Sequence, residues 1–393
     1  MIREIKKEEI AELIQKVDAL GRYLTNHPEV SGEEKDSSEY IIRFLENEGY
    51  EITAPYGEMP YSFRAVDKEK KHFHGKKAAF LCEYDALPEV GHACGHSYSC
   101  AISILGALLL KKFYPDLPMR IDLIGTPGEE FVGGKCYMTE NGAFDEYEYA
   151  AMIHLYNRDS TNFEILASND RYFTFHGKAA HASAFPEEGL NALNAARLYM
   201  EAMDMWRQHI TKDCQFHGIV VKGGEAPNIV PEEVCLDYYY RAATLENLWK
   251  LNKISETCAK GAAMATGTTV EWQQRYPDYG EIYWNDYMDE FVKEIFEHVG
   301  RTCEESPGPG GSSDIGNVNL KIPVFHPLLD ITGKDKTCVV HDRRFERILH
   351  TSEMERTLYD GGKILYELGI LLATDENRMK NIKEMHEKYR KLG

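Results

Sequence analysis

Several features are scarce or missing in this sequence. Its longest apolar stretch, residues 101–110, is too short to span a bilayer. The N-terminal segment is charged and lacks the apolar core of a secretory signal, so we expect no signal peptide and a cytoplasmic location. Basic residues number 45 against 64 acidic ones, giving a formal net charge of −19. With no basic stripe to neutralise phosphates, we expect neither a nucleic-acid partner nor binding to an anionic membrane surface.

A Cys-x-x-Cys motif is missing as well. The nine cysteines are an odd number, form no Cys-x-x-Cys pair, and several lie in apolar runs such as residues 79–82. We therefore expect reduced, mostly buried thiols and no disulfide framework. The length of 393 residues and the hydrophobic content of 43% leave room for two domains, or for one large domain that carries an insertion.

The first part of the chain alternates between two kinds of apolar spacing. Helices are expected over residues 4–25, 33–48 and 97–113, and strands over residues 77–82, 120–124 and 149–154. Strands that alternate with helices are typical of an open α/β sheet. In such sheets, binding residues follow the carboxyl ends of the strands.

The pattern changes after about residue 168. Strands are expected over residues 171–176, 217–222, 234–241 and 268–272, and helices over residues 186–206 and 244–265. The order β-α-β-β-α-β is typical of a ferredoxin-like module. After about residue 284 the earlier pattern returns. We therefore predict a discontinuous domain, residues 1–168 and 284–393, interrupted by an inserted domain, residues 169–283.

Two groups of polar residues follow predicted strands in the first domain. Cys94 and His96 lie two residues apart in a short glycine-bounded segment. Thiolate and imidazole are ligands that transition metals bind well. About thirty residues on, a strand runs into a Thr-Pro-Gly turn that ends in Glu129 and Glu130. Two carboxylates can divide the work of metal-assisted hydrolysis, one as a ligand and the other as a base.

Each of these signals is weak when taken alone. Buried cysteines and satisfied histidines are common in protein cores, and adjacent acids usually lie on a surface. His154 lies at the end of the strand predicted over residues 149–154, and it could instead be an ordinary histidine of the core. Taken together, their shared position at strand ends predicts a metal site, and the whole pattern predicts a metallohydrolase.

A series of motifs makes the chain resemble a known family. The motifs cover residues 85–88, 92–96, 128–130, 180–183, 186–192 and 226–231. In order and spacing they are similar to those of the metal-dependent amidohydrolases, which include hippurate hydrolase, the indole-acetyl-amino-acid hydrolases and aminobenzoyl-glutamate hydrolase. These enzymes are relatives of the co-catalytic zinc aminoacylases and carboxypeptidases. Residues 311–318 most resemble the aminobenzoyl-glutamate hydrolase and dipeptidase-like branch, and the resemblance covers residues 30–345.

The resemblance implies a fold and a cofactor. The fold is α/β: a mixed-sheet di-metal peptidase domain with helices on both faces, plus an inserted ferredoxin-like α+β lid domain for dimerisation. The cofactor is two divalent metal ions per subunit, with zinc expected first. Manganese, cobalt and nickel are alternatives, because a site with one thiolate among imidazoles and carboxylates accepts them too.

The resemblance also implies the metal ligands. The matching positions are Cys94, His96, Glu130, His154 and His341. Cys94 is the ligand that both ions share. His341 is chosen because a phenylalanine follows it four residues on, as in the family, and His350 is the alternative. His326 suits the role less well, since it lies in a strand-like segment.

Further roles follow from the same resemblance. Glu129 matches the general base, and Asp85 matches a carboxylate that supports a ligand without binding metal. In the inserted domain, His181 matches a histidine that polarises the scissile carbonyl from a neighbouring subunit, so we expect a homodimer. Asn228 and Arg241 match positions that hold the substrate carboxylate, a task that suits a planar guanidinium. The alternative for Arg241 is a local ion pair.

The activity implied is hydrolysis of an amide bond by a metal-activated water, with Glu129 as the base. The expected substrates are N-acyl amino acids, aryl-amides of amino acids, or dipeptides, each with a free carboxylate. One alternative is an exopeptidase of the aminopeptidase or carboxypeptidase type that trims short peptides, and another is a deacetylase of an amino-acid biosynthetic intermediate. A third is a non-catalytic binding protein, against which the pair Glu129 and Glu130 argues.

Overall fold

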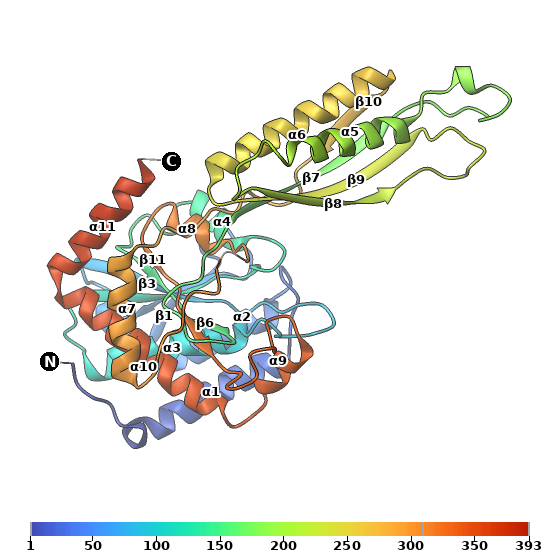
Figure 1. The fold of residues 1–393 in the computed structure, drawn as a ribbon. Coiled ribbons are helices and arrows are strands. Elements are labelled where there is room, and N and C mark those ends of the chain that lie inside the picture. The colour runs from blue at the N-terminus through green and yellow to red at the C-terminus, as the bar shows by residue number, and fades with distance from the viewer. Residues whose placement is uncertain (1, 309, 392–393) are drawn as a thin grey trace. The chain divides into compact units, whose positions relative to one another are not determined.

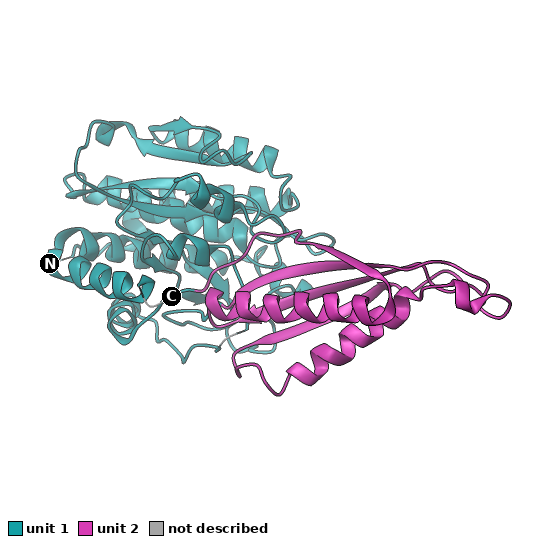
Figure 2. Ribbon diagram, turned by 90° about the horizontal axis from the view of Figure 1, so that it is seen from above, with its two compact units in different colours: residues 1–165, 282–392 teal, residues 166–281, 393 magenta. Residues whose placement is uncertain are grey.

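The computed structural model describes residues 2–308 and 310–391, and its elements are labelled in Figure 1. The chain forms two compact units, coloured separately in Figure 2. Unit 1 contains the residues up to 165 and those from 282 onward, and unit 2 contains residues 166–281. Among the described residues, no helix combines the length and the apolarity that crossing a membrane requires.

Unit 1 is built on a six-stranded mixed sheet in the order β1-β2-β4-β3-β5-β11. Its strands are β1 (Tyr50–Thr53), β2 (Phe63–Asp67), β3 (Lys76–Cys82), β4 (Met119–Gly125), β5 (Ala150–Ala151) and β11 (Val324–Phe325). The strands β4, β3, β5 and β11 are parallel, whereas β1 and β2 are antiparallel to their neighbours. A separate parallel pair is formed by β6 (His154–Tyr156) and β12 (Leu328–Asp330).

Helices cover both faces of this sheet (Figure 1). One face packs against α1 (Ala11–Asn26), α3 (His96–Phe113), α7 (Asp286–Val299) and α10 (Met354–Thr374), and the other against α4 (Gly134–Glu140) and α8 (Ile315–Asn319). Successive residues of a strand point to opposite faces, so Phe80 and Leu81 of β3 belong to different cores. The predicted mixed α/β sheet with helices on both faces is confirmed. The remaining helices are α2 (Lys35–Asn47), α9 (Arg343–Ile348) and α11 (Glu376–Arg390).

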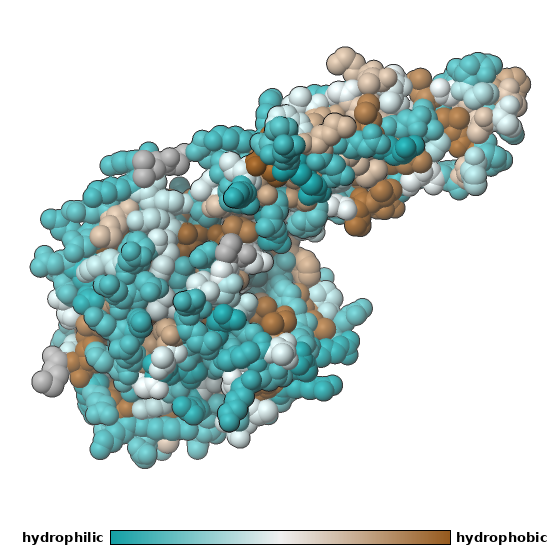
Figure 3. Space-filling model, in the orientation of Figure 1, coloured by the Kyte–Doolittle hydropathy of each residue, from teal (hydrophilic) through white to brown (hydrophobic). Residues whose placement is uncertain are grey.

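Unit 2 has a four-stranded antiparallel sheet in the order β10-β7-β9-β8. Its elements are β7 (Ala167–His176), α5 (Ala192–Trp206), β8 (Gln215–Lys222), β9 (Glu233–Ala242), α6 (Leu245–Thr266) and β10 (Thr269–Gln273). Both helices bury one face of the sheet around Phe173 and Tyr240. The element order β-α-β-β-α-β confirms the predicted ferredoxin-like fold. The edge strand β8 exposes Ile219, Val220 and Val221, and Figure 3 shows hydrophobic residues gathered over the end of this strand.

Two expected elements have different bounds in the structure. The helix predicted from residue 186 begins only at Ala192, because Gly189 is extended and Asn191 caps the helix through its side-chain oxygen. Residues Pro186–Glu188 form a separate 3-10 turn. The strand predicted over residues 149–154 is divided between β5 and β6, which pair with different partners.

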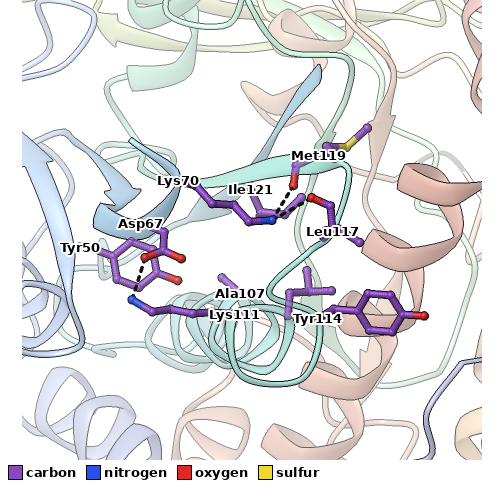
Figure 4. A pocket seen from close by; sticks show the side chains of 10 residues that line it. Tyr50, Asp67, Lys70, Ala107, Lys111, Tyr114, Leu117, Met119 and Ile121 are labelled. Atoms are coloured by element: carbon purple, nitrogen blue, oxygen red, sulfur yellow. Dashed lines mark hydrogen bonds and ion pairs between the residues drawn. The ribbon is translucent and has the colours of Figure 1, made fainter. Parts of the chain in front are cut away.

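A small cavity lies at the edge of the sheet where the parallel strands β3 and β4 begin (Figure 4). Lys111 Nζ is 2.9 Å from Asp67 Oδ1, and Lys70 Nζ donates to the carbonyl oxygen of Leu117 at 2.9 Å. These contacts hold both ammonium groups within the wall of the cavity. The residues predicted to bind metal follow the opposite ends of these strands, so this cavity is separate from them.

Candidate metal centre

The predicted ligands come together where parallel strands of unit 1 end. Asp85 follows β3, and Glu129 and Glu130 follow β4. His154 is the first residue of β6, three residues after β5 ends. Carboxyl ends of parallel strands meet at one edge of a sheet, which is why segments far apart in sequence converge here.

Gly95 lets the chain turn sharply between Cys94 and His96. Its φ of +90° is a left-handed conformation that favours glycine. A Cβ atom at this position would lie 2.9 Å from Leu155 Cβ, which is too close. The turn leads directly into α3, whose first residue is His96.

Two groups of donor atoms share one cysteine. The first group is Cys94, His96 and His154, and the second is Cys94, Glu130 and His341. Within each group, one donor atom from every residue lies within 4.8 Å of the others. A further group of the same kind joins His96 to both Glu129 and Glu130. The structure therefore brings together the five predicted ligands and the predicted base.

Hydrogen bonds orient the two imidazoles of the first group. His154 Nδ1 lies 2.8 Å from the carbonyl oxygen of Leu155, so it donates and leaves Nε2 facing Cys94 Sγ at 3.4 Å. His96 Nδ1 lies 2.8 Å from Asp85 Oδ1. A histidine that binds metal typically donates its other N–H to a carbonyl or carboxylate in this way.

Asp85 connects the two groups of donors. One oxygen accepts from His96, and the other accepts from the backbone N–H of Glu130 at 2.9 Å. Burial alone would raise the pKa of Asp85, but the charge of His96 and its hydrogen bond lower it to about 2. Asp85 is therefore an ionised acceptor that fixes one residue of each group.

His341 adopts a strained backbone conformation. Its φ of +69° is unusual for a residue other than glycine. Its N–H donates to the carbonyl oxygen of Ala93 at 2.8 Å, and its Nε2 lies 3.5 Å from Glu130 Oε1. By contrast, His350 pairs with Glu346 of the helix α9, which ends two residues before it. Among the described residues, neither His350 nor His326 belongs to a donor group, although the His326 ring lies 5.6 Å from that of His154.

A buried lysine, which sequence reasoning did not identify, lies beside the donors. Lys135 Nζ is 2.7 Å from Asp314 Oδ1 and 2.5 Å from Glu83 Oε1, and all three side chains are buried. The other oxygen of Glu83 is 3.6 Å from His96 Nε2. A lone lysine with partners 52 and 179 residues away gives no local sequence signal. Its ammonium balances two carboxylates that would otherwise be buried without a counter-charge.

The carboxylates and the thiol of the centre are held in a strongly anionic environment. Burial raises the pKa of Glu129, and the charges of Glu130 and Glu83 raise it further. Burial and the charge of Glu130 likewise raise the pKa of the Cys94 thiol. A divalent cation is the counter-charge that reverses both effects, because it favours thiolate and carboxylate over their protonated forms.

The donors fit a metal ion in their chemistry as well as their spacing. Among residues 2–308 and 310–391, His96 Nε2 and Glu130 Oε1 are buried and have no hydrogen-bond partner. Buried polar atoms without partners are rare and costly. One thiolate, three imidazoles and one carboxylate form a donor set that suits zinc and neighbouring transition metals.

The remaining predicted residues lie in unit 2. His181 and Asn228 belong to two loops that meet, since the N–H of Ala182 donates to the carbonyl oxygen of Asn228 at 2.9 Å. His181 Nδ1 accepts from the N–H of Ala184 at 3.2 Å. Arg241 lies at the opposite end of β9, paired with Gln215 of β8. Since a strand rises about 3.3 Å per residue, roughly 25 Å separate Arg241 from the other end of β9, from which the Asn228 loop extends.

Comparisons with known proteins give consistent results. A family profile described as the peptidase dimerisation domain matches residues 171–265. The Xaa-Arg dipeptidase of Mus musculus is 34% identical over 346 residues, which cover 84% of this chain and 80% of that protein. One of the two p-aminobenzoyl-glutamate hydrolase polypeptides of Escherichia coli (strain K12) is 30% identical over 278 residues, covering 65% of this chain and 57% of that protein.

Solved structures share the fold. A dinuclear metal binding peptidase of the M20 family from Bacillus subtilis aligns with a TM-score of 0.71 at 20% identity, over 92% of this chain and 99% of that structure. The aminobenzoyl-glutamate utilization protein of Klebsiella pneumoniae aligns with a TM-score of 0.70 at 18% identity, over 93% of this chain and 97% of that structure.

Proposed function

Because this chain belongs to the M20 family of metal-dependent peptidases and amidohydrolases, we propose that it hydrolyses the amide bond of dipeptides, in particular those with a basic C-terminal residue. The observation that carries this proposal is the 34% identity to a Xaa-Arg dipeptidase over 84% of the chain. The acidic balance of the chain, −19, supports it, since a negative field concentrates cationic substrates.

The two groups of donors would hold two divalent ions. Cys94, His96 and His154 would hold one ion, and Cys94, Glu130 and His341 would hold the other. When bound, the ions supply a water of lowered pKa and polarise the scissile carbonyl. Zinc is the first choice, with manganese, cobalt and nickel as alternatives.

The two C-terminal histidines can be distinguished by metal content. We expect His341→Ala to lose about one of the two ions per subunit, because a ligand of only one group is removed. The matched control is His350→Ala, which should keep both. Inductively coupled plasma mass spectrometry on purified protein measures the ratio. Full metal content in His341→Ala, or loss in His350→Ala, would reverse the assignment.

Glu129 handles the proton in this reaction. Its carboxylate takes a proton from the attacking water and gives it to the nitrogen of the leaving amine. The contacts of Asp85 and the adjacent ligand Glu130 keep Glu129 beside His96, which supports this role.

His181 supplies a hydrogen bond to the oxyanion that develops on the scissile carbonyl. Its Nδ1 accepts from a backbone N–H, so the proton of the neutral ring is on Nε2, which is then a donor. Donors held in place before the reaction stabilise such charge most effectively.

The chain acts as a homodimer whose two subunits associate through unit 2. Ile219 of the edge strand β8 is 65% exposed, and exposed apolar edge strands readily pair with another chain. His181 and Asn228 lie together, whereas Arg241 lies at the far end of β9. These residues therefore act on one substrate only if they come from different subunits, with Arg241 from one and the other two from its partner.

A substrate panel tests the proposal directly. The protein, loaded in turn with zinc, manganese or cobalt, is assayed for released amine. The panel contains dipeptides ending in arginine or lysine, the same dipeptides ending in glutamate, p-aminobenzoyl-glutamate and N-acetyl amino acids. We expect the fastest turnover on the basic dipeptides. Absence of hydrolysis across the panel would contradict the proposed activity.

The panel also separates the other possible functions. Preference for p-aminobenzoyl-glutamate would indicate an activity like that of the p-aminobenzoyl-glutamate hydrolase of Escherichia coli. Preference for N-acetyl amino acids would indicate a deacetylase. Cleavage of tripeptides and longer peptides would indicate a general exopeptidase. We place the enzyme in the cytoplasm, in keeping with a sequence whose nine cysteines form no Cys-x-x-Cys pair.

A further inference from the structure

Three side chains from other segments of unit 1 accept hydrogen bonds from the backbone of the turn that carries Glu129 and Glu130. The N–H of Gly128 donates to Glu34 Oε1 at 2.8 Å, and the N–H of Glu130 donates to Asp85 at 2.9 Å. The N–H of Phe131 donates to Ser31 Oγ at 3.0 Å. Residues on both sides of Glu129 are therefore fixed by side chains from elsewhere in unit 1.

Glu34 occupies a position that normally caps a helix. It is the residue before α2, where a side chain usually accepts from the first turn. The structure shows no such cap: the carboxylate of Glu29 takes this task instead, accepting from the N–H groups of Asp36 at 3.1 Å and Ser37 at 2.6 Å. The carboxylate of Glu34 is thereby available for Gly32, at 2.9 Å, and Gly128.

The burial of Glu34 is costly. Its side chain is fully buried, and Oε2 has no hydrogen-bond partner among the described residues. Burial and the nearby charge of Asp85 raise its pKa to about 7. A buried carboxyl with a partly unsatisfied charge destabilises a fold. Departures of this kind from ordinary stability rules are expected at functional sites.

We propose that Glu34 is a positioning residue for the reaction, which holds the turn at Gly128 so that the carboxylate of Glu129 faces the attacking water. Ser31 assists on the other side of the turn through Phe131. The proposal rests on the proposed function, since it assigns Glu129 as the base. Neither Glu34 nor Ser31 belongs to a donor group among the described residues, so neither acts by binding metal.

Four variants test the proposal. Glu34→Leu keeps most of the side-chain volume and removes the acceptor. Glu34→Gln keeps an oxygen that can accept from both N–H groups. Ser31→Ala removes the second acceptor, and Glu33→Leu changes the exposed neighbour as a matched control. The substrate is the best dipeptide of the panel, and kcat, KM, metal content and melting temperature are measured for each.

We expect kcat of Glu34→Leu to fall about ten- to a hundredfold, because small displacements of catalytic groups have effects of that size. KM and metal content should stay unchanged. Glu34→Gln should retain at least half of the activity, and Ser31→Ala should lose several-fold. In a Glu129→Gln background, Glu34→Leu should cause no further loss, because both changes then remove the same contribution.

Several outcomes would overturn the proposal. One is a kcat of Glu34→Leu that stays within twofold of that of the unchanged protein. Another is a loss of kcat in Glu34→Gln as large as that in Glu34→Leu. If Glu34→Leu fails to fold, full activity in Ser31→Ala decides against it. A purely structural role would lower the melting temperature of Glu34→Leu while leaving kcat of the folded fraction unchanged. An inactive unchanged protein would count against the proposed function instead, whereas a loss in Glu33→Leu equal to that in Glu34→Leu would overturn the role of Glu34.

Discussion

Changing Glu129 to glutamine is expected to abolish turnover while the protein keeps its full metal content. Glutamine has nearly the same shape but cannot take a proton from water at neutral pH, so the loss should be about 10²- to 10⁴-fold in kcat. Single-turnover assays with the best dipeptide of the panel, combined with metal analysis of the same sample, measure both quantities.

The neighbouring residue provides the control. Glu130 is also a glutamate on the same turn, but it belongs with Cys94 and His341 in a donor group. Glu130→Gln should therefore lose metal together with activity, whereas Glu129→Gln should lose activity alone. Activity of Glu129→Gln within tenfold of the unchanged protein would show that another group is the base.

Changing His181 to alanine is expected to lower kcat on the order of a hundredfold or more, because it removes a donor to the oxyanion. Metal content should not change, since His181 belongs to unit 2 and to none of the donor groups found among the described residues. His176→Ala is a matched control: this histidine is also in unit 2 and pairs with Glu271 on the sheet.

Mixing two inactive variants tests whether His181 acts across subunits. Equal amounts of His181→Ala and Glu129→Gln, unfolded and refolded together, form mixed dimers in which one site of two has both residues. Statistical assembly should then restore about a quarter of the unchanged activity. Recovery requires that each site uses His181 of its partner. No recovery, in a sample whose dimers have formed, would place His181 and Glu129 of each site in the same subunit.

The candidate metal centre was largely predictable because its ligands follow strands. Glu129 and Glu130 closely follow the buried strand β4, Cys94 and His96 lie where the segment after β3 runs into α3, and an α/β sheet brings such segments together. The choice between His341 and His350 could not be made by this rule. It depends on a backbone contact between His341 and Ala93, residues far apart in sequence.

The surroundings of the centre were not predictable. Lys135 and Glu34 look like ordinary surface residues in the sequence, and only long-range packing buries them. The strands β1 and β2 were missed too. The burial of β2 alternates along Phe63–Asp67, so its pattern was present but short.

The inserted domain was predicted from its element order, whereas its loops were not. Regular alternation identifies strands such as β9, and the order of strands and helices identifies the ferredoxin-like fold. The start of α5 depends on one capping residue, Asn191, inside a segment that otherwise has helical spacing. Local turn chemistry there overrides the periodic pattern.

The attachment of His341 to Ala93 has a consequence for the order of events during synthesis. A growing chain contains Cys94, His96 and His154 well before it contains His341, and unit 2 is translated in between. Domains generally fold as units from the N-terminus during translation. A ribosome-bound chain that has not yet reached His341 therefore contains only the first trio of the proposed ligands, and the second ion would have to enter after His341 has left the ribosome.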